Sequence, residues 1–158
     1  MSAYAELAVD SLRDFYAANL QAQLTLVETA AGLSAGDLPP PSAYLDYPRP
    51  RDNRTLLQIY ETGLTPRDQR NGTWFVECVV AFTYNSMGAD LSDAYVKLRR
   101  YLTAILWTVL KNPTLGGAVI GCNLIRSDPI QEVGDKSMTR HHYVSHWNVL
   151  VSSEVTFT

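Results

Sequence analysis

The stretch DLSDAYVKLRRYLTAILWTVLKNPTLGGAVIG, residues 90–121, decides the fold of this chain. Apolar side chains recur in it every three to four residues, which predicts an amphipathic helix from Asp90 to Lys111. Asp90 suits the N-cap, and Lys111 suits the negative end of the helix dipole. The expected buried stripe comprises Leu91, Ala94, Tyr95, Leu98, Tyr101, Leu102, Ile105, Leu106 and Val109.

The glycines that close this stretch raise the question of a phosphate-binding loop. Such a loop follows a strand and opens a helix, because the helix N-terminus supplies free amides and the positive end of the dipole. Gly116, Gly117 and Gly121 instead come after the helix, beyond Pro113, and no Gly-Lys-Ser/Thr sequence accompanies them. They predict a helix end, a turn and the entry into the next strand.

The remaining chain alternates between one more helical pattern and several strand patterns. Residues 4–32 have helical periodicity, residues 55–62 and 71–85 read as strands, and two further strands are expected at 118–128 and 143–157, separated by a polar loop at 131–142. In the strand at 71–85 the even positions from Trp74 to Tyr84 should face the core. We expect an α+β fold, with a mixed or mainly antiparallel sheet of about four to five strands packed with an N-terminal helix and one long central helix.

The segment 33–54 contains five of the eight prolines, so neither regular helix nor central strand fits it. With 158 residues, the chain is expected to form a single domain spanning 1–158 with this segment as an extended proline-rich arm. The hydrophobic fraction of 46% is typical of a globular protein, and the net charge of −3 gives no indication of nucleic-acid affinity. No membrane span and no signal peptide are expected, which predicts free, buried thiols at Cys78 and Cys122.

The polar residues do not form a catalytic pattern. His142 and His146 share a strand face about 13 Å apart, too far for one metal ion, so the histidines, His141 included, are expected at the surface or in turns. Ser145 and His146 point to opposite faces and cannot form a dyad. Cys78 lies on an apolar face, where a thiol has a raised pKa and is inert. The sequence therefore predicts no enzyme, no cofactor and no metal site.

Arginine and aromatic residues are the more informative set. Half of the ten arginines fall in the loops that flank the strand at 55–62, where a solvated loop surface and a partner surface both fit. Val96 and Trp107 align on the side of the central helix away from its buried stripe. The candidate subunit or partner interface therefore comprises Tyr44, Tyr47, Arg49, Arg51, Arg54, Arg67, Arg70, Val96 and Trp107.

The order of these elements resembles the tail terminator proteins of tailed bacteriophages, also called tail completion or head–tail joining (neck) proteins. The resemblance rests on LRDFYAANLQAQLTLVE, LPPPSAYL, the central helix and the tandem glycine after it, and it covers most of the chain in order. It implies a small α+β subunit of a homo-oligomeric ring, commonly a hexamer. Such a ring sits on the last ring of the tail tube protein, stops polymerisation and docks on the head completion proteins.

The resemblance further implies a virion protein, assembled in the host cytoplasm, whose lumen passes genomic DNA without specific binding. It carries over no catalytic residue, no cofactor and no membrane contact. Two alternatives remain open. One is a head-completion neck protein of the adaptor or stopper kind, and the other is a small α+β ligand-binding protein or enzyme.

Overall fold

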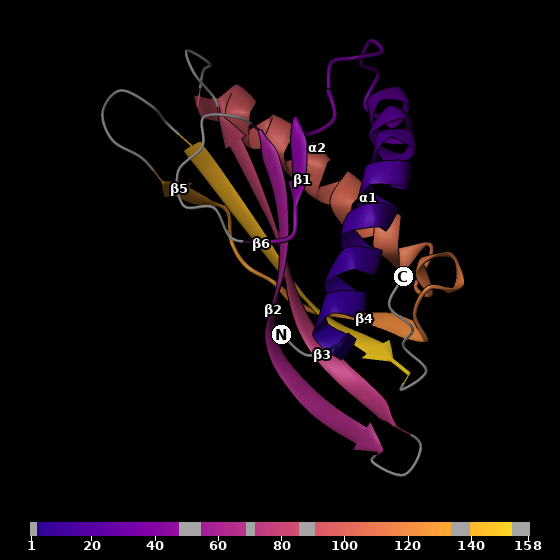
Figure 1. Ribbon diagram of the computed structural model, residues 1–158. Coiled ribbons are helices and arrows are strands. Elements are labelled where there is room, and N and C mark those ends of the chain that lie inside the picture. The colour runs from indigo at the N-terminus through magenta and orange to yellow at the C-terminus, as the bar shows by residue number, and fades with distance from the viewer. Residues whose placement is uncertain (1–2, 48–54, 69–71, 86–90, 134–139, 153–158) are drawn as a thin grey trace.

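The structure is a computed structural model and describes residues 3–47, 55–68, 72–85, 91–133 and 140–152. The elements are α1 (Ala3–Ala30), β1 (Ala43–Leu45), β2 (Leu56–Asp68), β3 (Thr73–Asn85), α2 (Leu91–Leu110), a 3₁₀ turn (Leu115–Gly117), β4 (Gly121–Ser127), β5 (Gln131–Val133) and β6 (Arg140–Val151). They confirm the α+β fold, with the expected N-terminal helix and long central helix (Figure 1).

The strands form one mixed sheet in the order β1-β2-β3-β6-β4, with β5 pairing to β6. All pairs are antiparallel except β1 with β2. Strand β3 is central, since it pairs along its length with both β2 and β6. The two additional three-residue strands, β1 and β5, lie in segments whose sequence predicts an arm and a loop.

Both helices pack on one face of this sheet and enclose the core with it (Figure 1). Helix α1 buries a stripe of residues along its whole length, among them Leu12, Tyr16, Leu20 and Leu24. The Tyr16 hydroxyl, which is fully buried, donates a hydrogen bond of 3.0 Å to the carbonyl oxygen of Ile105 on α2. Because a buried hydroxyl needs a partner, this bond fixes where the two helices cross.

The core-facing side of β3 is as the alternation predicts. Val76, Cys78, Val80 and Phe82 are buried beneath the helices, and Trp74 and Tyr84 pack partly against the same cluster. The opposite face differs from the expectation of a single buried side, because Val79 and Ala81 are also buried. Each lies between larger cross-strand neighbours on β2 and β6, which cover these small side chains.

Candidate functional site

The first part of the proline-rich arm is anchored to both helices. The buried carboxylate of Glu28 accepts a hydrogen bond of 2.9 Å from the backbone N–H of Leu38. On the other side, the Tyr101 hydroxyl donates a hydrogen bond of 2.6 Å to the carbonyl oxygen of Pro39. Burial raises the pKa of Tyr101, so this hydroxyl keeps its proton. Hydrogen bonds to both helices therefore hold the described part of the arm in place.

Beyond the prolines the arm joins the sheet as β1. The backbone N–H of Ser42 donates to the carbonyl oxygen of Thr55, and the Arg13 guanidinium on α1 pairs with Asp46 at 2.7 Å. Tyr44 packs partly against the core from β1, whereas Tyr47 is 48% exposed. Of the two candidate tyrosines, Tyr47 is thus the one that offers most of its ring to a partner.

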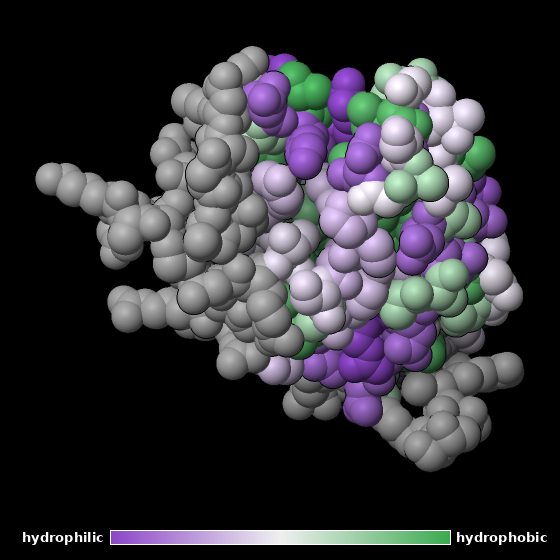
Figure 2. Space-filling model, turned by 90° about the horizontal axis from the view of Figure 1, so that it is seen from above, coloured by the Kyte–Doolittle hydropathy of each residue, from purple (hydrophilic) through white to green (hydrophobic). Residues whose placement is uncertain are grey.

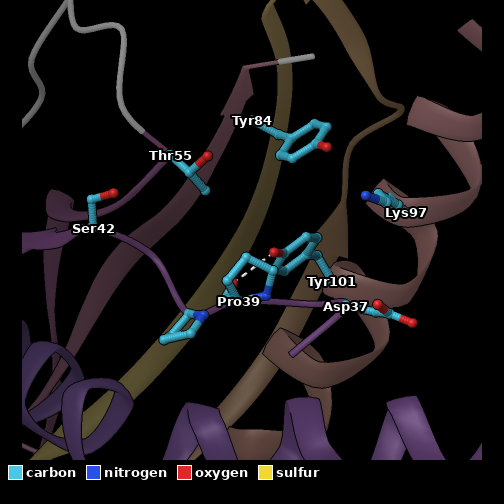
Figure 3. Close-up of a pocket in the computed structure, with 8 residues that line it drawn as sticks. Asp37, Pro39, Ser42, Thr55, Tyr84, Lys97 and Tyr101 are labelled. Atoms are coloured by element: carbon cyan, nitrogen blue, oxygen red, sulfur yellow. Dashed lines mark hydrogen bonds between the residues drawn. The ribbon is translucent and has the colours of Figure 1, made fainter. Parts of the chain in front are cut away.

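A small cavity lies between the arm, the start of β2 and α2 (Figure 3). Its volume is about 190 Å³, and its lining comprises Asp37, Pro39, Pro40, Ser42, Thr55, Tyr84, Lys97 and Tyr101. In Figure 3 the Lys97 ammonium and the Tyr84 ring lie across the cavity from Ser42. Ligand pockets usually measure about 300–1,000 Å³. This cavity is smaller, and it contains no pairing of a nucleophile with a base among the described residues.

The central helix places Val96 and Trp107 in line, as their spacing predicts, and both are half-buried. Trp107 packs partly against the core, so the indole is less exposed than a position on the polar side suggests. The Lys111 ammonium lies 4.3 Å from the centre of the Trp107 ring and also donates to the Gln23 side chain on α1. Through Lys111, the Trp107 side of α2 therefore takes part in the contact between the two helices.

Of the five candidate arginines, the structure describes only Arg67. Strand β2 extends to Asp68 instead of ending near Thr62, so Arg67 lies at the far end of a 13-residue strand. At about 3.3 Å per residue, Arg67 is roughly 35 Å from Leu56. The expectation of a short strand failed because Gly63 and Pro66 mark a turn locally, whereas an edge strand tolerates both. Arg49, Arg51, Arg54 and Arg70 lie outside the described residues.

The histidines occupy two different environments. His142 and His146 share one face of β6, as expected, but His141 is fully buried on the core face beside Tyr84. The expectation of a surface or turn position is therefore wrong for His141. Neither ring nitrogen of His141 has a hydrogen-bond partner among the described residues. The His141 and Tyr95 rings pack in a T-shaped arrangement, with their centroids 5.3 Å apart. Strand β6 begins at Arg140, inside the expected loop at 131–142, so the alternation through Tyr143 and Trp147 extends to His141 and places it on the core face.

An ion-pair cluster that the sequence did not suggest joins β4 to β6. The Asp128 carboxylate contacts His146 Nε2 at 2.9 Å and Arg126 Nε at 3.2 Å. The hydrogen bond with His146 is the main cause that lowers the pKa of Asp128, and Arg126 adds to it. Ser145 points to the opposite face, where its hydroxyl accepts from the Trp147 indole, so no Ser–His–Asp arrangement forms. This cluster connects strands and does not form a catalytic triad.

The two thiols are buried, as the sequence predicts. Cys78 and Cys122 are free and buried, and burial raises the pKa of Cys122 to about 12 and that of Cys78 still further. Within the described residues, no group of three or more His, Cys, Asp or Glu side chains could hold a metal ion. His142 Nδ1 instead contacts the Thr83 hydroxyl at 3.2 Å, and burial lowers the pKa of His142.

The end of the molecule that carries the arm has a mixed surface. Figure 2 shows polar and apolar side chains interspersed on this face, without one large apolar patch in its coloured part. Among the described helices, none is long and apolar enough to cross a membrane. Comparison with protein-family models and with curated proteins finds no match.

Proposed function

We propose that this protein is a structural subunit of a bacteriophage virion, a tail terminator that forms a homo-oligomeric ring at the head-proximal end of the tail. The ring stops polymerisation of the tail tube protein and joins the tail to the head completion proteins. Its action is steric: one ring face matches the tube, and the other presents a surface that tube subunits cannot extend. It requires no cofactor.

The observation that best supports this proposal is the layering of the fold. Two helices cover one face of an open sheet, and the element order is the one on which the resemblance to tail terminators rests. A ring subunit needs two different complementary surfaces, because each copy contacts two neighbours through different patches. An open sheet with helices on one side supplies such surfaces at its two edges. The net charge of −3 also suits a lumen that passes DNA without holding it.

The competing functions have less support. A ligand-binding protein or enzyme is favoured only by the cavity of about 190 Å³ beside Lys97 and Tyr84. A head-completion protein shares the expected partners, but adaptors of that kind are usually more helical, and small-barrel stoppers have less helix than α1 and α2 provide.

The experiment that tests the proposal measures both assembly and capping. Light scattering gives the mass of the purified protein alone and with its tail tube protein, and electron microscopy gives the length of tubes polymerised with and without it. A ring-sized species that shortens tubes and remains at one tube end is expected. Tubes that grow to the same length with and without the protein would contradict the proposal.

The candidate arginines are tested by the same mass measurement and by counting, in electron micrographs, the tails that join to heads. Reversing the charge of Arg51 and Arg54 together should weaken tail joining if the arm contacts a partner, whereas Arg99→Glu, on the exposed side of α2, is the matched control. Unchanged ring mass and unchanged tail joining in the Arg51→Glu/Arg54→Glu variant would remove the arm from the interface.

A further inference from the structure

Among the described strands, the far part of β2 and the outer side of β4 have no pairing strand. Strand β1 covers only residues 56–58 of β2, and no described strand pairs with the outer side of β2 beyond them. Residues 62–67 of β2 are all exposed. At the other end, β4 pairs only with β6 among the described strands, and Asn123 and residues 125–127 are exposed. In Figure 1 the exposed part of β2 extends with β3 beyond the helices.

Each exposed edge also carries an exposed aliphatic side chain. Leu64 on β2 is 38% exposed and Ile125 on β4 is 44% exposed. An uncovered strand edge presents unpaired N–H and C=O groups that another strand can bind. On β2, irregular pairing around Thr62 and Arg67, together with Pro66, interrupts the edge. Such features limit indiscriminate pairing, so a partner strand has to match a short segment.

The strand directions make the two edges compatible with each other. Strands β2, β3, β6 and β4 alternate in direction across the sheet, because each neighbouring pair is antiparallel. If a second copy continues the sheet with its helices on the same side, its β2 lies beside β4 of the first copy and runs antiparallel to it. The alternation of the sheet therefore continues across the junction, with the commoner type of strand pairing.

We propose that the β2 edge of one copy, residues 62–67, pairs with the β4 edge of the next copy, residues 123–127. The sheet then runs continuously around the ring. This inference rests on the proposed function in one respect, since it takes the copies to form a closed ring. Pairing of β2 with β2 about a two-fold axis would stop at a dimer and leave both β4 edges uncovered. The heterologous pairing covers both of these edges once the ring closes.

Cross-linking tests which edges meet. Leu64→Cys and Ile125→Cys place thiols on the two edges, while the native cysteines are buried and have raised pKa values. With a short bis-maleimide, a mixture of the two single variants should give covalent dimers, and the double variant should give a ladder up to the full ring. Neither single variant alone should cross-link. Homodimers of Leu64→Cys alone would overturn the pairing, because they require β2 to meet β2.

Lysine at the same positions tests whether the edges hold the ring. Leu64→Lys and Ile125→Lys should each abolish the ring-sized species, since an edge lysine opposes strand addition. The matched control is Leu26→Lys, which replaces an exposed leucine, 49% exposed, on α1. Circular dichroism checks that each variant is folded. If a lysine variant does not fold, cross-linking of the cysteine variants still tests the pairing.

The outcomes separate this inference from the proposed function. A ring that persists in both lysine variants and does not cross-link between Leu64→Cys and Ile125→Cys overturns the edge pairing and leaves the terminator function intact. An edge-linked ring that fails to limit tube length supports the pairing and overturns the terminator function. A wild-type protein that stays monomeric both alone and with tubes overturns both.

Discussion

At the scale of single residues, Glu28 holds the arm to α1. Its carboxylate is only 5% exposed and accepts the backbone N–H of Leu38 at 2.9 Å. Glu28→Ala leaves that buried N–H without an acceptor, which we expect to lower the free energy of unfolding by about 1–3 kcal/mol. Glu28→Gln keeps an acceptor oxygen, so its free energy of unfolding should fall clearly less. Urea unfolding of the two variants measures the difference, and equal losses would contradict the role of this hydrogen bond.

His141 is the opposite case, a buried polar side chain without a partner among the described residues. A buried donor or acceptor that makes no hydrogen bond costs about 1–3 kcal/mol. We therefore expect His141→Leu, which is similar in volume, to raise the free energy of unfolding by about 1 kcal/mol. His142→Leu is the control, because His142 contacts the Thr83 hydroxyl and is only partly buried. Destabilisation by His141→Leu in thermal unfolding would show that His141 has a partner.

At the scale of elements, the turn between α2 and β4 depends on glycine. Gly117 has φ +93°, a conformation that side chains rarely adopt, although a Cβ there would meet nothing within 4 Å. Gly117→Ala should therefore lower the free energy of unfolding by roughly 1–2 kcal/mol through backbone strain alone. Gly121→Ala is the matched control, since Gly121 also has open space around it and no positive φ. Equal stability of the two variants in urea would contradict the strain.

The link between β4 and β6 should be visible as a pH effect. The hydrogen bond with His146 is the main cause that holds the pKa of Asp128 below its usual value of 3.8. Because the folded pKa is lowered, the stabilisation is fully present above pH 3.8 and is lost as the pH falls through the folded pKa. Carbon NMR of the Asp128 carboxyl group should show a midpoint below 3.8 in the wild type and a higher one in His146→Gln. An unchanged midpoint would assign the shift to Arg126 instead.

Local periodicity predicted the elements that are long and one-sided. Helix α2 spans Leu91–Leu110 where the sequence predicts 90–111, and the buried side of β3 is the expected one. Apolar residues repeat every 3.6 residues along α2 and every 2 residues along β3, over many positions. Only a helix in the first case and a strand in the second places those residues on one buried side. The Gly116–Gly117 pair forms the predicted turn. Its place after a helix, and not before one, already spoke against a phosphate-binding loop.

Other features depend on contacts between distant segments, and the sequence could not predict them. Strand β1 has three residues and exists only because it pairs in parallel with β2. The far half of β2 contains Gly63 and Pro66, which locally favour a turn, yet pairing with β3 keeps it extended. The Asp128–His146 contact needs β4 beside β6, and no spacing in the sequence indicates that two segments 18 residues apart will pair.

At the scale of the whole molecule, the two thiols can report on global opening. Cys78 on β3 and Cys122 on β4 are both buried beneath the helices, and their raised pKa values keep the thiolate form scarce. A reagent should reach either thiol only when the helices leave the sheet. If the chain unfolds as one cooperative unit, the two thiols should therefore be labelled together, at a rate set by global unfolding.

If the protein assembles into the proposed ring, the labelling rate should also depend on protein concentration. A ring binds folded subunits and not unfolded ones, so mass action should slow labelling of both thiols as the protein concentration rises. Mass spectrometry of maleimide labelling in mild urea, over a hundredfold range of concentration, measures this effect. Leu26→Cys supplies an exposed thiol, 49% exposed in the native leucine, that should react quickly at every concentration. Early labelling of Cys122 alone would indicate that β4 opens separately from the rest of the sheet. Labelling independent of concentration, under conditions where light scattering finds rings, would mean that assembly does not stabilise the folded subunit.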